Sequence, residues 1–303
     1  MAVYVVGDFL RETRLRKGYT QEEVSYGICT PASLSRIENG AQKPGRLILE
    51  KLFERLGTEN NLFNSFVSRE EMELYSAIQE LIRNITDDAV SKIETQIEVV
   101  EKLAVNTSEL EHQCLYFAKG ELARQKEKDD EKAMEMYMKA IHITLPDFDG
   151  KNPLRNNLLT FDEIMIINSI AILYGNSENV ITAIQLDMWL KEYMENKIVD
   201  GKMKTTKYPM IMYNLSCWLE DKGCYREELR MAEQGIDFCV KYGNLVAFPR
   251  LILNQGIASV ELGQIDNAKK YLHQAVTIFE TMKRMDTVEY ITTWCRNEYQ
   301  IEI

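Results

Sequence analysis

The sequence has few residues of the kind that build catalytic or metal centres. It contains three histidines, and its six cysteines are scattered along the chain without a C-x-x-C pair. It lacks the G-x-x-x-x-G-K-[ST] and G-x-G-x-x-G phosphate-binding loops and the H-E-x-x-H and G-x-S-x-G catalytic motifs. We therefore expect no enzyme activity, no metal site and no cofactor. We interpret His142 and His273 as solvated residues on helix faces.

Long apolar segments are also missing. The longest apolar run, Ile164–Tyr174, is interrupted by two polar residues and is too short to span a bilayer. Asp8 and Arg11 interrupt the start of the chain, so we expect no signal peptide. Most cysteines are then expected to be buried as small hydrophobic residues in a reduced, cytoplasmic protein that makes no membrane contact.

The charge of the chain is unevenly distributed. The 303 residues carry a net charge of −11, which by itself argues against a nucleic-acid partner. Residues 1–57, however, hold nine Lys and Arg against seven Asp and Glu, so this part is +2 and the remainder is −13. A small basic segment joined to a larger acidic one is typical of a DNA-binding domain attached to a domain with another role.

Residues 20–40 predict two short helices separated by a tight turn. Thr20 is a suitable N-cap, and Glu23 completes a capping box three residues later. Gly27 marks the end of the first helix, and Thr30-Pro31 caps and begins the second. Two such helices are either an ordinary helical hairpin or a helix-turn-helix, whose second helix enters the major groove of DNA.

The residues themselves favour the second interpretation. Gln21 and the run Leu34-Ser35-Arg36-Ile37-Glu38-Asn39-Gly40 closely resemble the phage-repressor-like (XRE-type) helix-turn-helix family over residues 6–57. The resemblance implies an internal salt bridge between Arg14 and Glu38. The connection between the two helices is one residue shorter than in phage repressors. Together with Cys29-Thr30-Pro31, this spacing looks like the Rgg-type branch of Gram-positive regulators.

The second helix of the motif supplies the candidate DNA contacts. Arg36 and Ala32 lie one turn apart on its outer face, where an arginine pairs with guanine or phosphate and an alanine lies against a thymine methyl group. The predicted DNA-binding residues are Gln21, Pro31, Ala32, Ser33, Ser35, Arg36 and Lys43. Helices over Val6–Lys17 and Arg46–Leu56 complete this domain. We expect residues 58–68 to form a joint. Its Leu62, Phe63 and Phe66 should pack against the rest of the chain, residues 69–303, which we call the body, or against a second subunit.

The remainder of the chain predicts paired helices, with the prolines falling between them. Pro249–Glu280 carries small residues at positions 8, 20 and 27 and a glycine turn at position 15, and so resembles a tetratricopeptide repeat. Pro209–Tyr242 repeats the pattern except for Glu228 at position 20. Further, looser pairs are expected over 70–104, Cys114–Leu145 and 160–198, with a capping helix over Thr287–Tyr299.

Asparagines recur at one position of these repeats. Asn214 and Asn254 share position 6, which lies on the inner surface of a tetratricopeptide repeat, and Asn168 approximates it. An asparagine amide offers both a donor and an acceptor, so it can hold the backbone of an extended peptide. The alternative is that these amides are solvated or bond one another. The candidate peptide-binding residues are Asn168, Asn214, Asn254, Tyr213 and Arg250.

The combined architecture resembles the Rgg/PlcR/PrgX-type (RRNPP) regulators of Gram-positive bacteria. The expected fold is all-α, with an XRE-type domain over residues 1–68 and a right-handed tetratricopeptide-repeat solenoid over residues 69–303. The resemblance implies a homodimer that binds promoter DNA and responds to a short signalling peptide in the repeat groove. Two alternatives remain open: a peptide-independent repressor whose repeats dock a partner protein, and a receptor for a small molecule.

Overall fold

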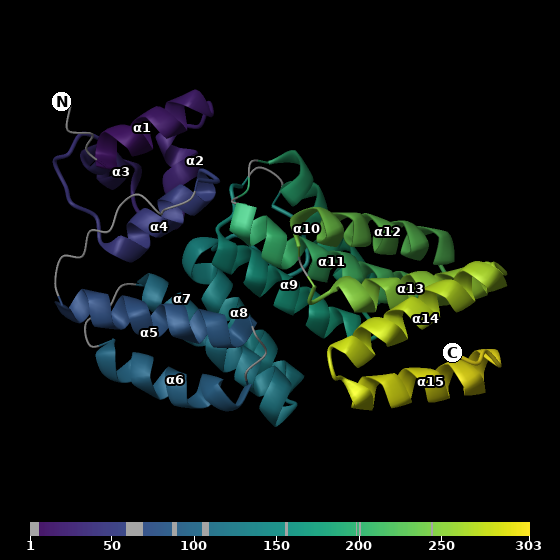
Figure 1. The fold of residues 1–303 in the computed structure, drawn as a ribbon. Coiled ribbons are helices and arrows are strands. Elements are labelled where there is room, and N and C mark those ends of the chain that lie inside the picture. The colour runs from purple at the N-terminus through teal and green to yellow at the C-terminus, as the bar shows by residue number, and fades with distance from the viewer. Residues whose placement is uncertain are drawn as a thin grey trace. The chain divides into compact units, whose positions relative to one another are not determined.

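The expected all-α fold is confirmed. Every regular element of the computed structural model is a helix, and the described part of the chain contains no strand (Figure 1). The structure describes residues 6–58, 69–86, 90–104, 109–154, 157–197, 199, 201–243 and 245–303. The joint expected at 58–68, with Leu62, Phe63 and Phe66, lies almost entirely outside these residues.

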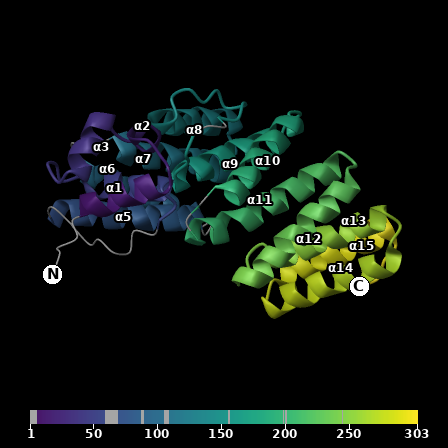
Figure 2. The same ribbon diagram turned by 90° about the horizontal axis from the view of Figure 1, so that it is seen from above.

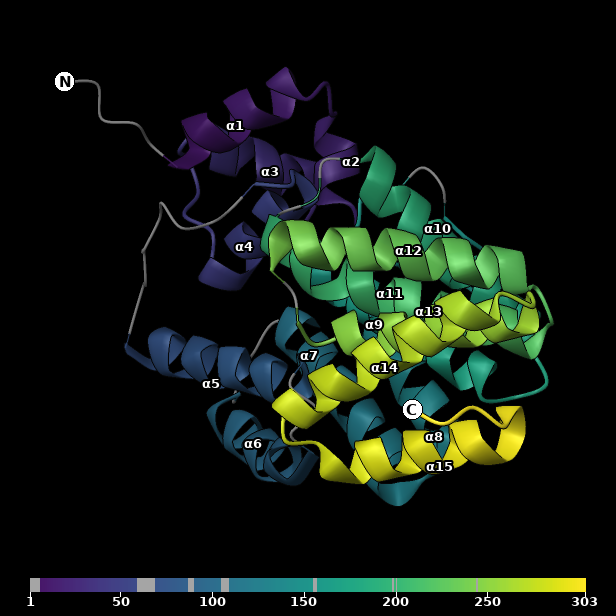
Figure 3. The same cartoon turned by 45° about the vertical axis from the view of Figure 1, so that its right-hand side comes forward.

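The first four helices form the predicted helix-turn-helix domain, which we call the head. They are α1 (Val6–Arg16), α2 (Gln21–Ser25), α3 (Pro31–Glu38) and α4 (Arg46–Arg55). Leu10, Val24, Leu34 and Leu52 have no exposed surface and meet in one core, because each stands on the inner stripe of its helix. Figure 3 shows these helices gathered in the purple and blue part of the ribbon.

The local signals of the head are confirmed. The Thr20 hydroxyl accepts a hydrogen bond from the Glu23 backbone N–H, and the Glu23 carboxylate accepts one from the Thr20 N–H, which completes the capping box. Thr30 caps α3 in the same way by accepting from Ser33 N–H. Gly27 has a φ of 68°, a left-handed conformation that glycine adopts without steric cost.

Eleven further α-helices follow within the described residues. They are α5 (Arg69–Thr86), α6 (Val90–Leu103), α7 (Glu109–Leu122), α8 (Asp130–Thr144), α9 (Phe161–Gly175), α10 (Val180–Asn196), α11 (Gly201–Asp221), α12 (Tyr225–Tyr242), α13 (Phe248–Glu261), α14 (Ile265–Thr281) and α15 (Met285–Tyr299). A short π-helix, η1 (Ala123–Glu127), continues α7. Each expected helical pair is present, and the capping helix is α15.

The chain divides into two compact units. The first contains Met1–Tyr174 and Lys197–Gly201, and the second contains Gly175–Asn196 and Lys202–Ile303. In the first unit α5 lies beside α6 and α7 beside α8; in the second, α12, α13, α14 and α15 follow one another as neighbours (Figure 2).

Small residues stand where helices cross closely, as the repeat pattern predicted. A Cβ atom on Gly256 would lie 2.7 Å from the Leu272 side chain, and one on Gly235 would lie 2.8 Å from Leu251. Both distances are below van der Waals contact, so a larger residue would push the helices apart.

Two expectations about individual residue types are wrong in part. Pro209 lies inside α11 rather than between helices, because α11 begins two turns earlier, at Gly201, and continues past a residue that lacks a backbone N–H. Only Cys114, Cys239 and Cys295 are buried, whereas Cys29 and Cys217 are half-buried and Cys224 is exposed in the turn before α12. His142 and His273 are exposed, as expected. No described helix is both long and apolar enough to cross a membrane.

Candidate DNA-binding head and ligand-binding face

A buried ion pair holds the head together. Arg14 Nε lies 2.6 Å from Glu38 Oε1 and Arg14 Nη2 lies 2.8 Å from Oε2, with side-chain exposures of 9% and 1%. The hydrogen bond to Glu38 is the main cause of the raised pKa of Arg14. Gln21 Nε2 donates a hydrogen bond to Glu38 Oε2 at 2.7 Å, the oxygen that also accepts from Arg14 Nη2. The salt bridge implied by the family resemblance is therefore present, and it ties α1 and the start of α2 to the end of α3.

The outer face of α3 is open. Pro31, Ala32 and Arg36 are exposed, and Ser33 and Ser35 are half-buried beside them. Lys43 is exposed in the following loop, while Gln21 is half-buried with its amide nitrogen shared with Glu38. The seven predicted DNA contacts are thus accessible at least in part.

Arg36 is held by two neighbours. Its Nη2 donates to Ser33 Oγ at 3.1 Å, and its Nε donates to Gln42 Oε1 at 3.0 Å. The sequence prediction missed Gln42, because it lies beyond the Gly40 helix stop and has no periodic relation to α3. These contacts fix the plane of the Arg36 guanidinium, which orients it for a planar partner such as a guanine edge.

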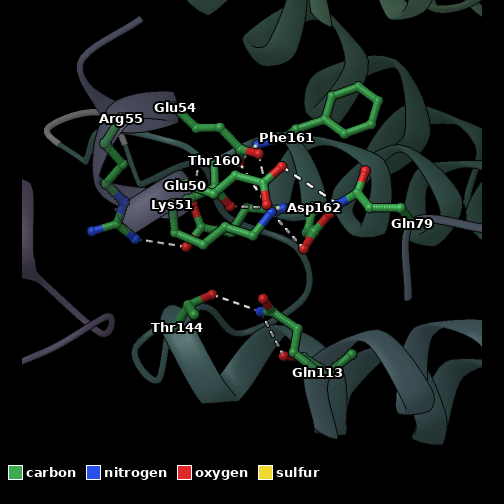
Figure 4. Close-up of polar contacts among 12 residues, drawn as sticks. Glu50, Lys51, Glu54, Arg55, Gln79, Gln113, Thr144, Thr160, Phe161 and Asp162 are labelled. Atoms are coloured by element: carbon green, nitrogen blue, oxygen red, sulfur yellow. Dashed lines mark hydrogen bonds and ion pairs between the residues drawn. The ribbon is translucent and has the colours of Figure 1, made fainter. Parts of the chain in front are cut away.

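The turn of the helix-turn-helix contacts the end of α8. The Tyr26 hydroxyl donates a hydrogen bond to Asp147 Oδ2 at 2.5 Å. Burial of the hydroxyl, followed by this hydrogen bond, raises the pKa of Tyr26. A Cβ atom on Gly27 would lie 2.0 Å from the Thr144 carbonyl oxygen. Gln113 of α7 donates to Thr144 Oγ1 at 2.7 Å and so fixes this contact point (Figure 4).

Charged residues of α4 are buried against the first turn of α9 (Figure 4). Lys51 Nζ lies 3.1 Å from Glu54 and 2.9 Å from Asp162, and the Phe161 N–H donates to Glu54 Oε2 at 3.0 Å. Burial raises the pKa of Glu54 to about 7, with the carboxylates of Asp162 and Glu50 adding to the increase and Lys51 opposing it. Sequence reasoning missed this contact, since charged helix residues usually face solvent.

In the second unit, Asn254 of α13 contacts Ser216 of α11 and Arg250 of α13 contacts Tyr213 of α11, and we call the surface that these two helices share the α11–α13 face. Its residues are Tyr213, Asn214, Cys217, Glu220, Arg250, Asn254 and Glu261. The Arg250 guanidinium carbon lies 5.6 Å from the centre of the Tyr213 ring, a cation–π contact. Tyr213 and Arg250, which we had predicted as companions of the asparagines, are therefore neighbours.

The asparagines make internal contacts. Asn254, which is 3% exposed, donates from Nδ2 to Ser216 Oγ at 2.7 Å and lies 3.2 Å from Cys217 Sγ. Asn214 is half-buried, and its Nδ2 is 3.4 Å from Asp187 Oδ2. Asn168 is buried in α9 of the first unit. The printed contacts of Asn214 and Asn254 are therefore to other side chains of the protein and not to one another.

Family models match one segment near the start of the chain and one near its end. A helix-turn-helix domain matches residues 5–66, and a tetratricopeptide repeat matches residues 249–281. The uncharacterized HTH-type transcriptional regulator YqaF of Bacillus subtilis (strain 168) is 38% identical over 63 residues, which are 20% of this chain and 83% of YqaF. The chain belongs to the HTH-type transcriptional regulators, which are DNA-binding proteins and not enzymes.

Two solved structures share the fold over nearly the whole chain. Bacillus thuringiensis PlcR in complex with the peptide PapR7 and DNA has a TM-score of 0.60 at 18% identity, over 95% of this chain and 98% of PlcR. ComR from S. thermophilus in complex with DNA and its signalling peptide ComS has a TM-score of 0.52 at 15% identity, over 95% and 97%. The expected likeness to Rgg/PlcR/PrgX-type regulators is confirmed at the level of the fold.

Proposed function

We propose that this chain is a cytoplasmic transcription regulator that binds double-stranded promoter DNA as a homodimer and is switched by a short linear signalling peptide. Residues 1–68 bind DNA, and residues 69–303 bind the peptide and form the dimer. The observation that carries the proposal is the exposed α3 face, on which Arg36 is oriented by Ser33 and Gln42.

Each DNA contact has a chemical role. Arg36 pairs with a guanine or a phosphate, and Ala32 packs against a thymine methyl group. Gln21, Ser33 and Ser35 donate to phosphates, Lys43 adds positive charge, and Pro31 starts the helix against the DNA backbone. Gln21 keeps one amide hydrogen for this contact, because only the other is used by Glu38.

The peptide is assigned to the repeats. On the α11–α13 face, the candidate contacts are Asn214, Asn254, Tyr213 and Arg250. Asn168 of α9 is a separate candidate within the first unit. The likeness to PlcR and ComR, whose structures hold both a peptide and DNA, supports this assignment. Because a ligand shifts an equilibrium only by binding one state better, the peptide must prefer one arrangement of the dimer over another.

Native mass spectrometry of the protein purified from its own host, with and without spent medium, tests the peptide assignment. We expect a bound peptide that alters operator binding when added back. A net hydrogen bond contributes about 0.5–1.5 kcal/mol, and a buried partner left unpaired costs more. Asn214→Ala should therefore weaken peptide binding by roughly tenfold, while peptide-free DNA binding is unchanged. If no exported peptide alters operator binding, the repeats dock a partner protein instead.

A further inference from the structure

Three glutamates gather at one end of the α11–α13 face. Glu220 lies in the last turn of α11, Glu228 in the first turn of α12 and Glu261 at the end of α13. Glu228 has no exposed surface, and neither of its carboxylate oxygens has a hydrogen-bond partner. Tyr225 and Tyr299 approach the same cluster beside Glu261. The cluster therefore contains a buried acid that the protein itself leaves unsatisfied.

The charges around Glu228 are all of one sign. Burial, followed by the carboxylates of Glu220, Glu261 and Asp221, raises the pKa of Glu228 to about 9. No ion pair joins Glu220, Glu228 or Glu261 to a lysine or arginine among the residues that the structure describes. A positive charge placed against Glu220 and Glu261 would relieve this repulsion, since opposite charges at short range stabilise a carboxylate.

The opposite end of the face carries the complementary charge. Arg250 is half-buried over the Tyr213 ring, and it forms no ion pair with a carboxylate in the described part of the chain. Between the two ends, Cys217 and Asn254 lie in contact. Along the helix axes, the α11–α13 face therefore carries the Arg250 cation at one end, the polar groups of Cys217 and Asn254 in the middle, and the cluster of glutamates at the other end.

The distance between the two charged ends of the α11–α13 face matches the length of a short extended peptide. Arg250 and Glu261 are separated by about 16 Å along α13 at a rise of ~1.5 Å per residue. An extended chain covers that distance with about five residues at ~3.3 Å each. The two charged ends of one short peptide can therefore reach both ends of the face.

We propose that the α11–α13 face binds a short peptide in one direction, with a carboxylate against Arg250 and an ammonium group against Glu220 and Glu261. The inference deepens the proposed peptide-binding function and rests on it. The carboxylate is the C-terminus or an acidic side chain, and the ammonium is the N-terminus or a lysine side chain. The ammonium contacts Glu220 and Glu261, and the buried Glu228 carboxyl lies behind them without touching the ligand.

Synthetic random hexapeptides test this direction on the full-length chain. One library without Lys, Arg, Asp or Glu is prepared with free termini, N-acetylated or C-amidated, and retained peptides are quantified by mass spectrometry after ultrafiltration. We expect N-acetylation and C-amidation each to reduce retention by about tenfold or more, the effect of losing one charged contact of ~1.5–3 kcal/mol. A second, N-acetylated library containing lysine shows whether a side-chain ammonium restores retention.

Variants assign each end. In the double variant Glu220→Gln/Glu261→Gln, free and N-acetylated peptides should be retained equally, while C-amidation still reduces retention. In Arg250→Gln, free and C-amidated peptides should be retained equally, while N-acetylation still reduces retention. The matched control is Glu227→Gln/Glu233→Gln, which removes two exposed charges from α12 and should behave as wild type.

Two results would overturn the inference in distinguishable ways. Equal retention of free, N-acetylated and C-amidated peptides by the wild-type chain would show that the face binds peptide without this direction. Retention of no peptide from any library would overturn the proposed peptide-binding function as well.

Discussion

Arg55 of α4 and Glu163 of α9 form an ion pair in which neither side chain has any exposed surface, with Nη2 2.6 Å from Oε1. Arg55 also donates to the Tyr26 carbonyl oxygen in the helix-turn-helix turn. Removing two charges from water is costly unless their partners are well placed, so the pair requires the head and α9 to keep this arrangement. The head is therefore a packed part of the first unit.

Arg55→Met should destabilise the protein strongly. The substitution leaves the Glu163 carboxylate buried without its partner, which costs about 3–5 kcal/mol. The measurement is the free energy of unfolding from a urea titration. Lys139→Ala is the matched control, because its pair with Glu135 is 48% and 60% exposed and is worth ~1 kcal/mol or less. Equal effects of the two substitutions would show that the Arg55 pair is not buried in solution.

Gly27→Ala should destabilise the protein more than Gly40→Ala does. Both glycines have a positive φ, of 68° and 70°, so each substitution introduces similar backbone strain of ~1–2 kcal/mol. Only at Gly27 would the new methyl group meet another segment, 2.0 Å from the Thr144 oxygen, whereas no atom lies within 4 Å at Gly40. Overpacking adds about 1–3 kcal/mol. Thermal unfolding of both variants measures the difference, and identical melting temperatures would argue against the contact with α8.

The contacts of Arg55 with Glu163 and of Gly27 with Thr144 were not predictable from the sequence. The head was predictable because its signals are local: Thr20 and Glu23 are three residues apart, and Gly27 breaks a periodic pattern. The Arg14–Glu38 pair spans 24 residues and needed a family resemblance. The Arg55–Glu163 pair spans 108 residues, and nothing in the local pattern distinguishes it from solvated charges.

The body was predictable to a similar depth. Small residues such as Gly256 revealed the helical pairs, because close helix crossings exclude larger side chains. The repeat position of Asn254 was recognisable, but a position does not show where an amide points. In the structure that amide is donated to Ser216 on the neighbouring helix. The acid cluster around Glu228 was visible only as a departure from the repeat pattern.

The stability of the first unit should fall as the pH rises from about 4.5 to about 7. The pKa of Glu54 is raised from its ordinary value of 4.5 to about 7, so the folded state binds a proton that the unfolded state has released over this range. The stabilisation is complete below pH 4.5 and is lost as the pH passes 7. Each pKa unit corresponds to roughly 1.4 kcal/mol, so the loss is on the order of 3 kcal/mol.

Urea titrations at several pH values, on the wild type and on Glu54→Gln, measure this loss. The glutamine variant cannot release a proton, so its free energy of unfolding should change less between pH 5 and pH 8. Lys51, Asp162 and Glu50 surround Glu54 and are unchanged in the variant. Parallel pH profiles of the two proteins would show that Glu54 titrates normally.

Glu38→Ala should unfold the head while the repeats remain helical. The substitution leaves the buried Arg14 guanidinium without its partner, which lowers the free energy of unfolding by about 3–5 kcal/mol. It also removes the hydrogen bond that Gln21 donates to Glu38. Hydrogen exchange of residues 6–58 should accelerate relative to α13 and α14. The exposed Glu22→Ala change is the control and should alter stability by ~0.5 kcal/mol or less. Unchanged protection of α1 and α3 in the Glu38 variant would contradict a structural role for the pair.

Arg36→Ala should weaken specific DNA binding without affecting the fold. Loss of one base contact costs ~1–3 kcal/mol, or between about fivefold and about 150-fold in affinity. Arg36 is exposed and its partners are surface residues, so the melting temperature should stay within a degree or two of wild type. Arg16→Ala, which removes an exposed charge from α1, controls for the change in net charge.

Selection of random double-stranded DNA by the purified full-length chain, followed by sequencing, tests recognition through α3 most directly. We expect enrichment of a site with two half-sites related by a twofold axis, as a dimer of helix-turn-helix domains requires. We expect the Arg36→Ala chain to lose the preference at one base pair in each half-site. A wild-type pool without an enriched sequence, or an unchanged site and affinity for Arg36→Ala, would contradict DNA recognition by this face.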